Sequence, residues 1–131
     1  MTSESMRKVF DLKAFVPARN YGLSRAFYRE LGFAENWANS EVCEMELDGC
    51  RFLLQNFYVA ELAANFMLSL QVADLDEWWE FIKRIDLQAR YDLHLVRAPA
   101  LQPWGLRVLY LSDPSGVLWH LTEQPKSAAQ S

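Results

Sequence analysis

The imidazole of His120 is one of only two in this chain, and it stands in a regular strand pattern. Residues 117–122 alternate, so Trp119 and Leu121 point to one side of a strand and His120 to the other. On the sheet face that carries both polar and apolar side chains, His120 could act as a general base, bind a ligand by a hydrogen bond, or have only a structural role. His120 is the one catalytic candidate in the sequence. Because no residue adjacent in sequence orients its imidazole, all three roles stay open.

Other reactive patterns are missing from the sequence. Ser69 and Ser112 lack a partnered histidine in a local nucleophile motif. No glycine-rich loop of the kind that cradles phosphates occurs. The chain therefore favours a binding site over nucleophilic or phosphate chemistry.

The remaining candidates come from the mixed faces of four predicted strands, near residues 10–16, 50–57, 66–72 and 117–122. One face of each strand is apolar and suits a core, whereas the other mixes polar and apolar side chains. If the sheet curls, those mixed faces line one concave wall, the usual form of a small-molecule site. The predicted ligand-binding residues are Lys13, Phe15, Arg51, Gln55, Met67, Trp104 and His120.

Several of these residues have a simpler structural interpretation. Lys13 could bind an anionic substrate or form an ion pair with Glu44 or Glu46. A tight hairpin places Arg51 opposite Glu46, which favours a structural pair there. Trp104, on a loop, could stack on a planar ligand or pack at the mouth of a barrel. Both interpretations of each residue are kept.

Turn residues fix the positions of the strands. The Asp-Pro-Ser-Gly sequence at 113–116 predicts a tight turn between strands 107–112 and 117–122. Asp48-Gly49 predicts a two-residue hairpin, in whose register Cys43 and Cys50 are not neighbours. We therefore expect two free thiols.

Strand and helix signals occur twice along the chain. Residues 10–16 alternate, which predicts that Phe10 and Leu12 face the core. Asn20 is a candidate N-cap for a helix that ends at Gly32, and Asp74 caps a second helix. The spacing of the two patterns, about 55 to 60 residues, indicates an internal repeat.

The chain is thus predicted to be an α+β protein of two βαβββ modules, whose strands form a curled mixed sheet. The single domain spans residues 8–124, with modules at 8–57 and 66–124. Residues 1–7 and 125–131 are expected to be flexible tails.

Composition excludes several classes of protein. The 131 residues are 51% hydrophobic and carry a net charge of −4, with no basic cluster for nucleic acid. No apolar run is long enough for a membrane span, and the N-terminus lacks a signal-like apolar core. We expect a cytoplasmic protein with no nucleic-acid or membrane partner.

The motif FYRELGF at 27–33 and the stretch PWGLRVLYLSDPSGVLWHLTE at 103–123, within a doubled module, resemble the vicinal oxygen chelate superfamily. This group includes glyoxalase I, bleomycin-resistance proteins and extradiol dioxygenases. The resemblance covers about residues 8–124 (element boundaries are good to a few residues). It implies the fold but does not fix the activity.

The resemblance also implies where a divalent metal would bind in the family's enzymes. The four ligand positions fall on Lys13, Met67, His120, and Leu53 or Gln55. Only His120 is a good ligand, and an ammonium would repel a cation. The interpretation is therefore that the chain uses no metal and no cofactor.

The resemblance is greatest to the bleomycin-resistance branch, whose members are metal-free homodimers that sequester an aromatic cation between subunits. We expect a homodimer that sequesters a small organic ligand on its concave sheet. One alternative is a lyase, isomerase or dioxygenase that uses His120 as base or metal ligand. The other is a partner-binding scaffold with a vestigial pocket.

Overall fold

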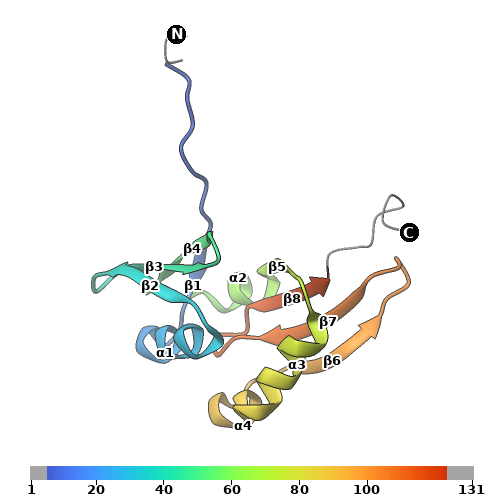
Figure 1. Cartoon of the computed structure of the whole chain (residues 1–131). Helices are drawn as coiled ribbons and strands as arrows, with labels where there is room; N and C mark the ends of the chain where they lie inside the picture. Colours follow the sequence, from blue (N-terminus) through green and yellow to red (C-terminus); the bar gives the residue numbers. More distant parts are fainter. Residues whose placement is uncertain (1–5, 124–131) are drawn as a thin grey trace.

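The computed structural model describes residues 6–123. The chain folds into two modules, each with a four-stranded mixed sheet and a helix against one face (Figure 1). Strand order is β1-β4-β3-β2 in the first sheet and β5-β8-β7-β6 in the second. The elements are β1 Phe15–Pro17, α1 Tyr21–Leu31, β2 Ala34–Ala38, β3 Val42–Leu47, β4 Cys50–Gln55, α2 Ala60–Asn65, β5 Met67–Val72, α3 Leu75–Arg84, α4 Leu87–Tyr91, β6 Val96–Leu101, β7 Arg107–Ser112 and β8 Leu118–Glu123.

The α+β fold of two βαβββ modules is confirmed. In each module the first strand runs parallel to the last, β1 beside β4 and β5 beside β8. The structure adds two short helices, α2 and α4, to this pattern. Of the predicted tails, 1–7 and 125–131, all but residues 6 and 7 lie outside the described residues, and the predicted domain boundaries stay predictions.

The local signals predicted the ends of the main helices. The Asn20 side chain accepts a hydrogen bond from the backbone N–H of Leu23, 3.1 Å away, and so caps α1. Gly32 ends that helix with a φ of 121°, a conformation that favours glycine. Asp74 caps α3 through the N–H of Glu77. These contacts involve residues three apart, which is why the sequence alone indicated them.

The Asp48-Gly49 hairpin has the predicted register. Both turn residues have positive φ, as a type I′ turn requires. Leu47 pairs with Cys50, and Cys43 pairs with Leu54. The two cysteines are therefore apart and free, as predicted, with Cys43 buried and Cys50 exposed.

The predicted first strand is wrong over most of its length. Only Phe15–Pro17 pairs with a neighbour, β4. Residues 6–14, the N-terminal arm, lie outside the strand. The arm extends away from the sheet toward residue 6 (Figure 1), while Asp11 and Lys13 near its base form ion pairs with the first sheet. Phe10 and Leu12 are 86% and 91% exposed, so they do not face the core. Alternation indicated an extended conformation correctly, but among residues 6–123 no surface covers the side chains of Phe10 and Leu12.

Buried side chains from both modules join in one core. The rings of Tyr28, Phe33, Phe52 and Trp119 lie with centroids 4.9 to 5.8 Å apart, mostly edge to face. This geometry adds attraction between aromatic rings to the burial of apolar area. Because α1 and β4 belong to module one and β8 to module two, this cluster fixes the modules to each other.

Hydrogen bonds across the same junction fix its orientation. The Tyr28 hydroxyl donates to Asp113 at 2.6 Å and accepts from the Trp119 indole N–H at 2.9 Å. Ser115, in the same turn, accepts from the backbone N–H of Arg19 at 2.9 Å. The predicted turn at 113–116 therefore reverses the chain and also docks module two against α1.

Candidate functional site

Each sheet has an outer face, turned away from its helix, and these two faces hold most of the predicted site residues. In the first sheet Phe15, Leu53 and Glu44 pair across adjacent strands, opposite the buried Val16 and Leu54. In the second sheet Met67 and His120 lie on the face opposite the buried Trp119 and Leu121. The strand alternation thus placed these residues on the correct faces.

The charged side chains on the first outer face form ion pairs with one another. The Lys13 ammonium lies 3.0 Å from a Glu44 carboxylate oxygen and 3.1 Å from one of Asp11. The Arg51 guanidinium pairs with Glu46 and Asp11, each at 3.3 Å. The structural alternative for Lys13 and Arg51 is the one observed, and the predicted pairing of Arg51 with Glu46 is confirmed.

These contacts shift the titration of the groups involved. Hydrogen bonds from Asn36 and then Lys13 hold the pKa of Glu44 below its usual value. Hydrogen bonds to Glu44 and Asp11 raise the pKa of Lys13. Both groups stay charged near neutral pH, and Lys13 remains an ammonium at the position that resembles a metal-ligand site.

Apolar and aromatic side chains stand exposed beside these charges. Phe15 is 52% and Trp37 45% exposed on the first sheet, and Met67 is 62% exposed on the second. Trp104, 61% exposed, lies in the loop between β6 and β7. Exposed aromatic and thioether groups next to polar ones suit contact with an organic surface.

His120 lies on the middle row of the second outer face. It pairs with Ser69 of β5 and Tyr110 of β7, and its ring meets that of Tyr110 edge to face at 4.8 Å. Its Nε2 is a buried polar atom without a hydrogen-bond partner among residues 6–123. Buried polar atoms are normally satisfied, so this one is notable. Neither the structure nor the relatives test the assignment of the seven predicted residues as ligand-binding, which stays a prediction.

Arg97 and Tyr110 were not predicted as site residues. Arg97 pairs with Tyr110, so both extend the row that contains His120. Alternation in residues 107–112 and the turn at 113–116 could have placed Tyr110 beside His120. Arg97 could not be placed, because the pairing of β6 with β7 shifts register between Arg97 and Ala100.

A cleft of about 570 Å³ lies elsewhere, at the junction of the modules. None of the seven predicted residues lines it. Its walls come from the end of α1, the Asp48 turn, the end of β5 and one side of α3. The cleft and the outer faces are thus separate features.

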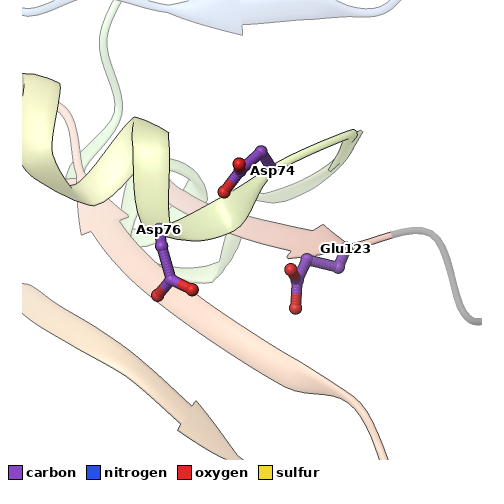
Figure 2. Close-up of side chains that lie close together, drawn as sticks. All are labelled: Asp74, Asp76 and Glu123. Atoms are coloured by element: carbon purple, nitrogen blue, oxygen red, sulfur yellow. The ribbon is translucent and has the colours of Figure 1, made fainter.

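Three carboxylates gather near the start of α3 (Figure 2). Asp74, Asp76 and Glu123 each place an oxygen within 4.8 Å of the others. The Arg107 guanidinium bonds Asp76 at 2.7 Å and Glu123 at 3.0 Å. Arg107 thus pairs with two of the three carboxylates, and these ion pairs join β7 and β8 to α3. Asp113 is not a partner of Arg107, because its carboxylate accepts hydrogen bonds from Tyr28 and from the backbone of its own turn.

The four positions that resemble metal-ligand sites do not fit a divalent ion. They hold an ammonium at Lys13, a thioether at Met67, an imidazole at His120 and either Leu53 or Gln55. The Lys13 charge is fixed in place by two carboxylates. One good donor and a fixed cation do not make a site for zinc, iron or nickel.

Comparison with known proteins agrees with this fold. The profile of the glyoxalase/bleomycin resistance protein/dioxygenase superfamily matches residues 12–121, and the chain belongs to that superfamily. A bleomycin resistance protein from Klebsiella pneumoniae is 30% identical over 112 residues, which cover 82% of this chain and 87% of that protein.

Solved structures share the fold. A bleomycin-binding protein complexed with bleomycin superimposes with a TM-score of 0.76 and 24% identity, over 89% of this chain and all of that one. A lactoylglutathione lyase from Agrobacterium tumefaciens gives a TM-score of 0.65 and 15% identity, over 88% of this chain and 95% of that one. Binding proteins and an enzyme thus share this architecture, so the function must be argued from the outer faces.

No helix within residues 6–123 is long and apolar enough to cross a membrane.

Proposed function

We propose that this protein binds and sequesters a small organic ligand on its outer sheet faces, without a metal and as a homodimer. The observation that supports it best is the set of exposed side chains beside polar groups on the two outer faces, Phe15 and Trp37 on the first sheet and Met67 on the second. Apolar surface of this kind is exposed to water on a single chain. Its burial by an organic molecule or a second subunit is therefore favourable.

The homodimer rests on the N-terminal arm. Its exposed apolar side chains include Phe10 and Leu12, each more than four-fifths exposed. An isolated extended segment of this kind contributes little to the stability of its own chain. A second copy of the chain can cover these side chains and complete the short β1 edge of the first sheet.

The dimer is tested by light scattering after size exclusion. We expect the double variant Phe10→Asp, Leu12→Asp to be a monomer and the unaltered chain a dimer. Leu62→Asp is the matched control, since Leu62 is also exposed, on α2, and should leave the dimer intact. If the unaltered chain is a monomer, or if the double variant is still a dimer, the proposed role of the arm in dimerisation is contradicted.

Ligand binding is tested by calorimetric titration, with bleomycin as the first probe because relatives carry that name. Phe15→Ala and Met67→Ala should weaken binding about tenfold or more, as loss of central contacts does. Leu62→Ala is the control. Elemental analysis of the untreated protein should find no stoichiometric zinc, nickel, manganese or iron. A bound metal, or failure of bleomycin and a broad compound panel to bind, would overturn the proposal.

The second candidate is an enzyme that uses His120 as a base. The unpartnered Nε2 favours it, because a free imidazole nitrogen can accept a proton from a bound molecule. In that case the bound compound would be converted to product, and His120→Gln would abolish turnover but not binding. Recovery of unchanged compound after prolonged incubation would leave sequestration as the function.

A further inference from the structure

Four polar side chains form a single row across the second outer face. Ser69 of β5 pairs with His120 of β8, His120 with Tyr110 of β7, and Tyr110 with Arg97 of β6. Paired residues on neighbouring strands point to the same side of a sheet and stand about 5 Å apart. Arg97, Tyr110 and His120 are therefore three consecutive neighbours that one ligand can touch together.

The row is unsatisfied within residues 6–123. His120 Nε2 has no hydrogen-bond partner. The structure gives the Tyr110 hydroxyl no hydrogen bond and the Arg97 guanidinium no ion pair there; the contact that Tyr110 makes is with the His120 ring. The charged groups described on the first outer face are all paired. This row instead holds a cation and a hydroxyl without such partners, and a buried imidazole nitrogen without a hydrogen bond.

The side chains on the same face as this row include a positive charge, that of Arg97, and no negative charge. The side chains that share this face come from alternate positions of β5, β7 and β8, with Arg97 on β6. None of them is a carboxylate, although the whole chain has a net charge of −4. The members are Met67, Ser69, Gln71, Arg97, Val108, Tyr110, Ser112, Leu118, His120 and Thr122.

We propose that the ligand carries an oxyanion, carboxylate or phosphate, which the Arg97 guanidinium binds with help from Tyr110 and His120. This inference rests on the proposed binding function and specifies its ligand. A guanidinium matches the two oxygens of such a group by paired hydrogen bonds. A tyrosine hydroxyl and an imidazole N–H donate to the same oxygens.

The test is a set of probes that share one ring system and differ in charge. 2-Naphthoate and 2-naphthyl phosphate are anionic, 2-naphthamide is neutral and 2-naphthylmethylamine is cationic. Titration calorimetry with the unaltered protein should show that one or both anions bind at least tenfold more tightly than the amide and the amine. The better of the two anions identifies the oxyanion.

Variants then assign the contact. Arg97→Gln should weaken binding of the preferred anion about 10- to 100-fold, the range for loss of a charged hydrogen bond, and leave binding of the amide unchanged. Tyr110→Phe should weaken binding of the preferred anion less than Arg97→Gln does. Arg84→Gln, which removes the same charge from the exposed side of α3, is the matched control and should have no effect. Circular dichroism confirms that each variant is folded.

The outcomes separate this inference from the function on which it rests. If bleomycin or another panel compound binds but the amide or amine matches the anions, or Arg97→Gln changes nothing, the oxyanion assignment is wrong and sequestration stands. If neither the naphthyl probes nor the panel binds, both proposals fail.

Discussion

The Tyr28 hydroxyl connects the two modules, and replacing Tyr28 by Phe tests how they are held together. The hydroxyl donates to Asp113 and accepts from Trp119, and all three side chains are buried. The substitution leaves a carboxylate oxygen short of a donor and an indole N–H without an acceptor. A lost hydrogen bond to a charged group and an unsatisfied buried donor together cost about 3 to 5 kcal/mol, a large share of a domain's stability.

The cost depends on pH through Asp113. Burial raises the pKa of Asp113 from 3.8 to about 6, although the Tyr28 hydroxyl and turn N–H groups oppose the shift. Because the folded pKa lies above the unfolded one, this group's contribution to stability is complete below pH 3.8 and is lost as pH rises through 6. Without the hydroxyl, the charged form loses a donor, so the deficit in Tyr28→Phe is larger at pH 8 than at pH 4.5.

The assay is urea unfolding followed by far-ultraviolet circular dichroism at both pH values. Tyr58→Phe is the control, since the structure gives its hydroxyl no hydrogen bond within residues 6–123, and its free energy of unfolding should change by less than about 0.5 kcal/mol. A loss below about 1 kcal/mol for Tyr28→Phe, or an equal loss at both pH values, would refute this account of the junction.

Three further predictions follow from local contacts. In the native protein a thiol reagent should modify the exposed Cys50 rapidly. Cys43 is buried, and burial raises the pKa of its thiol, so it should react only after unfolding. Rapid modification of both thiols in the native protein would contradict this. Asn20→Ala should lower the free energy of unfolding by about 1 kcal/mol through loss of the α1 cap, with Asn20→Ser restoring most of it. Arg25→Gln should cost about 1 kcal/mol at pH 7, because Arg25 lowers the pKa of Glu35 from 4.5. That difference should shrink as pH falls below 4.5, where the stability from a lowered carboxyl pKa is lost, and a constant difference would contradict the pairing.

Local signals in the sequence were enough for the elements and their faces. The Asp48-Gly49 turn determined the register of its hairpin and kept the cysteines apart, and Asn20 and Gly32 determined the ends of α1. Alternation placed Met67 and His120 opposite the core. Each of these inferences depends on residues a few positions apart, whose geometry the backbone itself restricts.

Contacts between groups far apart in the sequence became known from the folded structure. Tyr28 and Asp113 are 85 residues apart, and Arg97 joins the row of His120 through a strand pairing with a register shift. The same limit explains the N-terminal arm, since alternation predicts an extended chain but not the presence of a surface to cover it. The conformation of most segments and the side of each that is apolar could be predicted from the amino-acid order, because those properties arise from nearby residues. The partners of Lys13, Arg107 and Tyr28, and the open row on the second sheet, depend on how the modules and strands pack, a choice made by the whole chain.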